Sequence, residues 1–188
     1  MTNIILIGCG PHAKRVYLPA IQKMTNVKVS LVVELESQRS VTEKNLENFE
    51  NCEVLYTKPF QNGVPQDLAE EINKHIQENE VGGVIIASEP MIHKAYAKWA
   101  LSEGLNILLD KPITTRENVV SDLNQAKGIL EDYDELLSDY NNLQQTRNTV
   151  FMVNSQRRFH KGFQFVRDKI AEVSALTNCP INLSLIHI

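Results

Sequence analysis

The stretch Ile4-Ile5-Leu6-Ile7-Gly8-Cys9-Gly10-Pro11-His12-Ala13 decides the fold class of this chain. Four apolar residues predict a short buried strand, which breaks into Gly-x-Gly-x-x-Ala at the start of a helix. Gly8 permits the tight turn, Gly10 lets the backbone approach a pyrophosphate, and Ala13 keeps the helix close to the strand. Pro11 suits the first helical position, where the N–H it lacks would be unpaired anyway. Free amides and the positive end of the helix dipole then face phosphate, so the stretch predicts a dinucleotide-binding turn.

His12 occupies a variable position within this turn. We expect it to lie at the edge of the cofactor site and to face solvent there rather than to act in catalysis.

Length and composition are those of an ordinary globular chain. The 188 residues correspond to one full domain plus part of another, and 43% hydrophobic residues fit a packed core. The net charge of −4 argues against nucleic acid or an anionic membrane as the main partner, because both need a concentrated basic face. No apolar stretch is long enough to span a bilayer, and the N-terminal apolar run is too short for a signal peptide.

Cysteine usage indicates a reducing compartment. Cys9, Cys52 and Cys179 are odd in number, far apart and without metal-ligand spacing, so we expect free thiols and a cytoplasmic protein. Because Cys9 lies inside the glycine turn, a reactive thiol is conceivable there, but a small buried filler is favoured.

Strands and helices alternate through the first half of the chain. Strands are predicted at 4–7, 28–33, 53–56, 84–87 and 106–109. Helices are predicted at 11–24, 38–49, 66–79 and 92–103. Such alternation requires parallel crossovers, so we predict an α/β fold: a Rossmann-type doubly wound parallel sheet. Gly104 is the expected helix stop after residue 103, and Pro19 predicts a kink in the first helix.

The pattern changes after the fifth strand. Residues 114–117, Thr-Thr-Arg-Glu, resemble a capping box. They precede apolar residues spaced three or four apart, namely Val119, Leu123, Ala126, Leu130, Tyr133, Leu137 and Tyr140. This spacing predicts a long helix that buries those residues, continuous or broken at Gly128. Acidic residues at 131, 132, 134, 135 and 139 are interpreted as its solvated face, rather than as a surface for a partner. A sixth strand at 149–153 and a helix at 160–173 follow.

Glu34 lies at the end of the second predicted strand, about 20 residues after Ala13. A carboxylate there accepts hydrogen bonds from the adenosine ribose hydroxyls and repels a 2′-phosphate, which favours NAD. The alternative is a surface glutamate in a turn. Arg39 leaves NADP possible, because a nearby arginine offsets the repulsion.

Three further blocks follow in order. They are Ala87-Ser88-Glu89-Pro90-Met91-Ile92-His93, Leu108-Leu109-Asp110-Lys111-Pro112 and Asn154-Ser155-Gln156-Arg157-Arg158-Phe159. With the glycine turn, they resemble the Gfo/Idh/MocA family, the group of glucose–fructose oxidoreductase and inositol 2-dehydrogenase. The blocks are similar to the family's Ala-Thr-x-Pro-x-x-His, Glu-Lys-Pro and Asn-x-x-Arg-Phe runs, and the resemblance spans about residues 1–163.

This resemblance implies roles for individual residues. Ala87, Ser88 and Glu89 would pass beside the ribose and nicotinamide of the cofactor, with His93 near the same edge. Lys111 would be catalytic: its ammonium would face the reactive carbon of the nicotinamide, and would stabilise a developing alkoxide or relay a proton. The alternatives are a surface lysine at a strand end for Lys111 and a capping or packing role for His93.

Asp110 and Arg158 take the positions of the family's glutamate and arginine, and the resemblance implies that both contribute to the cofactor site. Asp110 has a shorter reach than glutamate, and Ser88 and Glu89 also depart from the usual residues. The resemblance further implies that the Lys111–Pro112 bond is cis. Arg157 and Arg158 could instead be solvated charges.

The function implied is an NAD(P)-dependent oxidoreductase that transfers hydride between nicotinamide and a secondary alcohol of a sugar, cyclitol or related polyol. Residues 1–158 would form the NAD-binding domain and 159–182 the start of a truncated α+β substrate domain. Residues 183–188 read like a translated sequencing adapter, although a first strand of the missing sheet is the alternative. We expect this fragment to be inactive and the full-length protein to be a homo-oligomer.

Two other functions share the glycine turn. A non-catalytic dinucleotide sensor or scaffold is the main alternative, because fold does not fix function. A methyltransferase that uses S-adenosylmethionine would leave the Asp-Lys-Pro and Arg-Phe blocks without a purpose.

Overall fold

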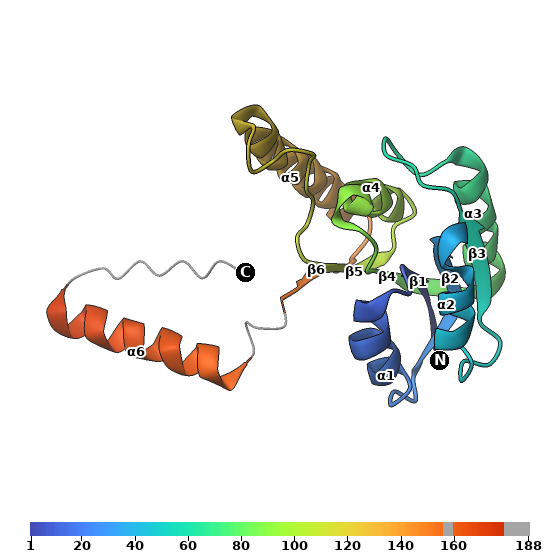
Figure 1. Ribbon diagram of the computed structural model, residues 1–188, viewed down its shortest axis with the longest axis horizontal. Coiled ribbons are helices and arrows are strands. Elements are labelled where there is room, and N and C mark those ends of the chain that lie inside the picture. The colour runs from blue at the N-terminus through green and yellow to red at the C-terminus, as the bar shows by residue number, and fades with distance from the viewer. Residues whose placement is uncertain (156–159, 179–188) are drawn as a thin grey trace. The chain divides into compact units, whose positions relative to one another are not determined.

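A computed structural model of the chain describes residues 1–155 and 160–178. Its backbone contacts divide the chain into two compact units, Met1–Asn154 and Ser155–Ile188. The first unit is built on a six-stranded sheet with the order β3-β2-β1-β4-β5-β6 (Figure 1), and every neighbouring pair of strands is parallel. This is the strand order of the Rossmann fold, so the predicted α/β class is confirmed.

The elements occur close to their predicted positions. The strands are Thr2–Ile7 (β1), Val27–Leu35 (β2), Glu53–Thr57 (β3), Val81–Ile86 (β4), Asn106–Asp110 (β5) and Phe151–Asn154 (β6). The α-helices are Leu18–Ile21 (α1), Arg39–Asn45 (α2), Gln66–Asn79 (α3), His93–Ser102 (α4), Leu123–Gln144 (α5) and Lys161–Thr177 (α6). Shorter helical segments are Ala13–Tyr17 (η1), Glu36–Gln38 (η2) and Pro90–Ile92 (η3).

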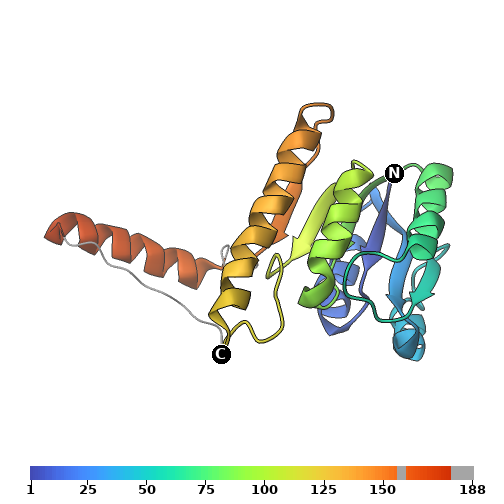
Figure 2. The ribbon, with the colours of Figure 1, turned by 90° about the horizontal axis from the view of Figure 1, so that it is seen from above.

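Helices cover both faces of the sheet in the first unit. Helices α3, α4 and α5 lie on one face, and α1 and α2 on the other (Figures 1 and 2). One core cluster includes Ile72 of α3, Tyr96 of α4 and Leu136 of α5, and the other includes Leu18 of α1. Because the sheet is covered on both sides, the central strands are apolar without alternation, as the run at residues 4–7 indicated.

The carboxyl ends of β1 and β4 border a crevice. Strand β1 pairs with β2 on one side and with β4 on the other. The chain builds outward from β1 to β3 and then returns to add β4, so the loops after β1 and β4 lead in opposite directions. Open α/β sheets bind their ligands at such a switch point. The glycine turn follows β1, and the loop at 87–90 follows β4.

The first helix changes its hydrogen-bonding pattern just before Pro19, where the sequence predicted a kink. Residues Ala13–Tyr17 form a π-helical turn, and the α-helix begins at Leu18. Pro19 has no N–H to donate to the carbonyl of Arg15, four residues earlier, so the regular helical ladder cannot pass this point. A π-turn is one of the known ways in which a helix accommodates such a break.

Helix α5 does not begin at the predicted capping box, and that prediction is wrong. The helix starts at Leu123, where the Asp122 carboxylate accepts a hydrogen bond from the Asn124 amide at 2.8 Å. Arg116 instead reaches across to Asp132 within the helix. Residues 114–117 therefore belong to the connection between β5 and α5.

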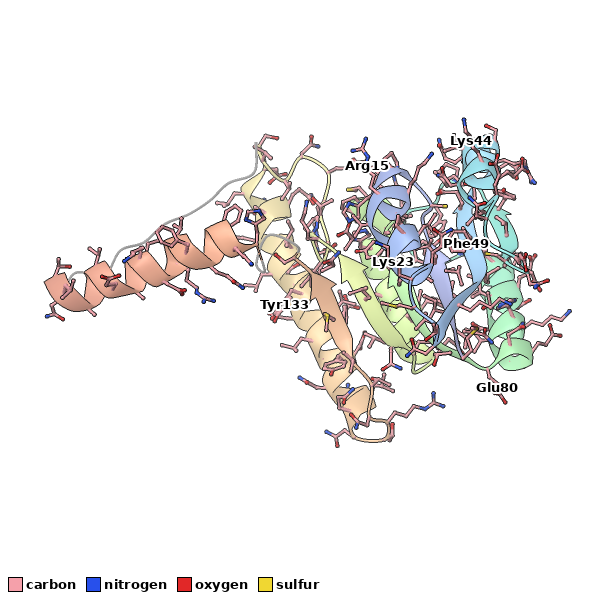
Figure 3. All side chains as sticks on the ribbon, turned by 90° about the horizontal axis from the view of Figure 1, so that it is seen from below. Arg15, Lys23, Lys44, Phe49, Glu80 and Tyr133 are labelled. Atoms are coloured by element: carbon pink, nitrogen blue, oxygen red, sulfur yellow. The ribbon has the colours of Figure 1, made fainter. Side chains whose placement is uncertain are left out.

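The predicted buried face of α5 is also wrong, apart from Tyr140, which packs against the core. Leu123, Leu130, Tyr133 and Leu137 are between 41% and 69% exposed (Figure 3 labels Tyr133). The buried positions are Gly128, Asp132 and Leu136, and the helix runs unbroken through Gly128. Asp132 is 5% exposed, so the interpretation of a wholly solvated acidic face fails at this residue.

Asp132 is buried because cations from other parts of the sequence pair with it. Asp132 binds Lys94 at 2.6 Å and Arg116 at 2.7 Å, and Glu135 binds Lys94 and Lys98. These pairs attach α5 to α4 through its acidic side. A buried charge is tolerated where it is paired in this way.

The second unit contains helix α6, which begins one residue after the predicted start. The ring of His160 accepts a hydrogen bond from the Gly162 amide at 3.2 Å and caps the helix. The domain boundary predicted at residue 158 and the tail at 183–188 lie outside the described residues and stay predictions. In residues 1–155 and 160–178, we find no helix with the length and apolar character needed to cross a membrane.

Candidate nucleotide-binding site

The turn after β1 requires glycine at position 8. Gly8 has a φ of +89°, a conformation that side chains rarely adopt. A Cβ atom at this position would lie 2.7 Å from the backbone of Ala87 and Ser88. The Gly8 amide donates to the Val33 carbonyl at 2.9 Å, and the Ala87 amide to the Ile7 carbonyl at 2.7 Å. The turn is therefore held tightly between β2 and the loop after β4.

The surroundings of Gly10 differ from those of Gly8. A Cβ atom built there would meet nothing within 4 Å, so it would project into open space beside the turn. The Lys14 amide donates to the Gly10 carbonyl at 3.0 Å, which places Gly10 just before the first helical turn. A backbone that is bare at this point, with a helix N-terminus behind it, fits the pyrophosphate of a dinucleotide.

A cavity of about 390 Å³ opens at the glycine turn. Its walls include most of the residues predicted for cofactor binding: Gly8, Gly10, Pro11, His12, Glu34, Ala87, Ser88 and Glu89. Ala13 is buried beneath the turn. The cavity therefore runs from the end of β2 to the loop after β4, as a dinucleotide site at this switch point requires.

Glu34 lines this cavity near the end of β2 and is held by the backbone. Its Oε2 atom accepts a hydrogen bond from the Cys9 amide at 2.6 Å, and Oε1 accepts one from the Leu35 amide at 2.8 Å. The carboxylate thus braces the glycine turn. Each oxygen keeps a further lone pair that a ribose hydroxyl can use.

Arg39 is engaged by its neighbours on η2 and β3. Its guanidinium makes two 2.8 Å hydrogen bonds to Glu36 and lies 3.8 Å from the centre of the Tyr56 ring. Its positive charge is therefore already paired with a carboxylate. This weakens the case for Arg39 as the partner of a 2′-phosphate.

A polar cluster forms where β1, β5 and β6 end. His12 Nε2 lies 3.4 Å from Asp110 Oδ2, which brings the glycine turn and the Asp-Lys-Pro block together at one edge of the sheet. The Tyr17 hydroxyl accepts a 2.6 Å hydrogen bond from the Asn154 side chain. Burial raises the pKa of Tyr17 to about 12, and the charge of Asp110 adds to this rise. Tyr17 therefore stays protonated and faces Asp110.

Lys111 is exposed and follows Asp110 at the end of β5. The Lys111–Pro112 bond is cis, as the resemblance implied. His93 is 1% exposed, and both of its ring nitrogens face backbone carbonyls, so its side chain does not line the cavity. Arg158 lies outside the described residues.

Several lining residues were not predicted from the sequence. They are Ile7, Val33, Leu35, Gln38, Thr57, Pro59, Phe60, Ile92 and Tyr96. A signal did exist for Thr57, Pro59 and Phe60, because they follow the third strand and the carboxyl ends of parallel strands meet at one edge. Tyr17 carried no comparable signal, since a tyrosine at an inward position of a helix is normal core.

A larger cavity of about 810 Å³ lies elsewhere, between α4 and the connection at 114–117. The basic residues on its wall, Lys94, Lys98 and Arg116, are paired with acidic residues of α5. It borders the helical layer rather than the glycine turn. The smaller cavity at the glycine turn is therefore the candidate nucleotide site.

The thiol of Cys9 is expected to be unreactive in the folded protein. Burial raises the pKa of Cys9 to about 11, with a further contribution from the charge of Glu34. At pH 8 the thiolate is then scarce, and we expect alkylation by iodoacetamide to be on the order of 100-fold slower than in urea. Peptide mass spectrometry would measure both rates. Rapid labelling of native Cys9 would instead favour the reactive-thiol interpretation.

Six parallel strands in this order, with a glycine turn after the first, define a Rossmann-type dinucleotide-binding domain. A family model for Gfo/Idh/MocA proteins, described as an oxidoreductase family with an NAD-binding Rossmann fold, matches residues 2–140. The chain belongs to this family. This confirms the resemblance drawn from the four sequence blocks, and it confirms the expected class of cofactor.

Solved structures of related proteins show the same fold. KijD10, a 3-ketoreductase from Actinomadura kijaniata in complex with NADP and TDP-benzene, matches with 19% identity and a TM-score of 0.61 over 91% of this chain and 42% of its own. A dehydrogenase from Chromobacterium violaceum matches with 15% identity and a TM-score of 0.63 over 91% and 40%. This chain thus spans about two-fifths of these proteins. No curated protein sequence matches the chain.

Proposed function

We propose that this chain is the cofactor-binding part of an oxidoreductase that interconverts a secondary alcohol and a ketone on a sugar, cyclitol or related polyol. The observation that carries the proposal is the contact, at one edge of the sheet, between His12 of the glycine turn and Asp110, the residue before Lys111. The 3-ketoreductase fold neighbour supports ketone chemistry, since reduction of a ketone is the reverse of alcohol oxidation.

In this proposal, some residues of the chain bind the cofactor and Lys111 acts on the proton of the substrate. The turn amides and Gly10 hold the pyrophosphate, Glu34 holds the adenosine ribose, and the loop at 87–90 supports the rest of the dinucleotide. The bound nicotinamide supplies the carbon that accepts or donates hydride. Lys111 then stabilises the substrate oxygen or moves its proton.

We further propose NAD as the preferred cofactor. The Glu34 carboxylate is fixed by two backbone amides, so it cannot swing away from a 2′-phosphate without losing both hydrogen bonds. Arg39, the nearby cation, is paired with Glu36.

Isothermal titration of the protein with NADH, and separately with NADPH, tests the binding half of the proposal. We expect Gly10→Val to weaken NADH binding at least about tenfold, equivalent to about 1.4 kcal/mol, because its side chain enters the space that the pyrophosphate would fill. NADPH should bind the wild-type protein more weakly than NADH. Equal NADH affinity for wild-type and Gly10→Val proteins would remove the phosphate-binding argument.

The proposal also covers the substrate domain, the oligomeric state and the cellular location of the protein. We propose that the substrate domain begins after residue 158 and that the full-length protein is a homo-oligomer. A reducing, cytoplasmic location is supported by Cys9 and Cys52, which are free thiols.

A further inference from the structure

His93 stands between two loops of the candidate site. It is the first residue of α4 and is 1% exposed. Its Nδ1 atom lies 2.8 Å from the Pro112 carbonyl oxygen, and its Nε2 atom lies 3.0 Å from the Ser88 carbonyl oxygen. Both distances are those of hydrogen bonds, so one ring touches the backbone of two separate segments.

The first of these segments forms a wall of the nucleotide cavity. Ser88 lines that cavity, and its backbone is packed against Gly8, where a Cβ atom would lie only 2.7 Å away. A dinucleotide seated on the turn would therefore press against the segment that His93 holds. The ring itself lies behind this wall, because His93 is not among the lining residues.

The second segment carries Lys111. Pro112 follows Lys111 directly, and Asp110, which precedes it, contacts His12 of the glycine turn. Lys111 is exposed and so is not fixed by packing. The direction of its side chain then depends on the backbone at either side, and His93 holds the Pro112 side.

We propose that His93 is a positioning residue that couples occupancy of the nucleotide cavity to the placement of Lys111. This inference rests on the proposed function. A neutral ring donates from one nitrogen and a protonated ring from both, but in either form movement of the Ser88 carbonyl changes the ring's contact with Pro112. Through this ring, nucleotide that orders the first loop also orders the second, and by thermodynamic linkage the second loop affects nucleotide binding to the same extent.

ADP-ribose is the probe that separates coupling from direct shielding. It has the phosphates and the adenosine of NAD but lacks the nicotinamide, the part proposed to face Lys111. We expect saturating ADP-ribose to slow acetylation of Lys111 by acetic anhydride about fivefold in the wild-type protein, a typical size for coupling between two sites. Mass spectrometry would measure the rate relative to Lys74, whose side chain on α3 is 74% exposed.

Three variants of His93 test whether its contacts with Ser88 and Pro112 carry this coupling. His93→Leu removes the polar contacts of the ring with both carbonyl oxygens. His93→Asn places an amide nitrogen near the position of Nδ1 and keeps the contact with Pro112, whereas His93→Gln places one near Nε2 and keeps the contact with Ser88. We expect all three to bind ADP-ribose and to show less than half of the wild-type protection of Lys111. The Asn and Gln variants provide the comparison if the Leu variant does not fold.

The outcomes distinguish this inference from the proposed function. Failure of ADP-ribose to bind the wild-type protein would contradict the proposed function. It would also contradict the coupling, which rests on that function. ADP-ribose that binds without changing the acetylation rate of Lys111 would contradict the role of His93. Equal protection of Lys111 in the wild-type protein and the His93 variants would contradict it too. Either result would leave the proposed nucleotide site unaffected.

Discussion

Gly8→Ala is expected to lower the free energy of unfolding by about 3 kcal/mol. About 1–2 kcal/mol of this comes from forcing a Cβ into a positive-φ conformation, here +89°. The rest comes from overlap with the backbone of Ala87 and Ser88, because overpacking costs about 1–3 kcal/mol. These neighbours are main-chain atoms of the loop after β4, so they cannot move aside as the end of a side chain could.

The matched control is Gly10→Ala in the same turn. Its Cβ meets nothing within 4 Å, so we expect the free energy of unfolding to stay within about 0.5 kcal/mol of wild type. Urea unfolding followed by circular dichroism would measure both variants. Equal stability of the Gly8 and Gly10 variants would mean that Gly8 does not pack tightly against the 87–90 loop.

The sheet and its glycine turn could be predicted from the sequence because their signals are local. Residues 4–7 are apolar without alternation, which is typical of a strand covered on both faces, and Gly-x-Gly follows at once. Glu34 could be found for the same reason, since it lies near the carboxyl end of the next strand. Its hydrogen bonds to the amides of Cys9 and Leu35 could not, because they depend on how closely the turn packs.

The face of α5 could not be predicted, because two patterns compete on one helix. Leucines and tyrosines recur at helical spacing, and acidic residues occupy the opposite side. Periodicity alone assigns the apolar side to the core. Yet Asp132 faces inward, since Lys94 of α4 and Arg116 of the preceding connection supply its partners. Nothing in the local sequence reveals those cations.

The part of the site around Lys111 was recognised by resemblance, but its supports were not. Tyr17 and Asn154 come from η1 and β6, 137 positions apart, and meet only after the sheet has formed. His93 was expected beside the cofactor and is instead buried with both nitrogens on carbonyl oxygens. Such contacts depend on backbone positions, which residue types do not encode.

Gly128→Ala is expected to destabilise the wild-type protein but to stabilise an Arg116→Ala protein. In a helix interior, alanine is favoured over glycine by about 1 kcal/mol. A methyl group at position 128, however, would overlap the Arg116 guanidinium, which crosses α5 there and makes hydrogen bonds of 2.7 and 2.9 Å to Asp132. Arg116 must then leave that carboxylate. We expect the loss of these hydrogen bonds to outweigh the gain in helix propensity, because Asp132 is 5% exposed and a buried carboxylate that loses a partner is destabilising.

The double-mutant cycle isolates the interaction. Gly128→Ala should destabilise the protein in the wild-type background and contribute about 1 kcal/mol of stability without Arg116, so the two substitutions should couple by more than about 1 kcal/mol. Urea unfolding of the four proteins at pH 7 would measure it. A stabilising Gly128→Ala in both backgrounds would show that Arg116 does not pack over this glycine.

The same cycle has an expected pH dependence. The hydrogen bonds from Arg116, and then the one from Lys94, hold the pKa of Asp132 below its ordinary value. A lowered folded-state pKa means that the stabilisation is complete above the unfolded-state value, about 4, and is lost as pH falls through the folded-state pKa. The coupling should therefore persist at pH 6 and shrink below pH of about 4. A coupling that stayed constant to acidic pH would mean that the Asp132 charge is not the group holding Arg116 over the helix.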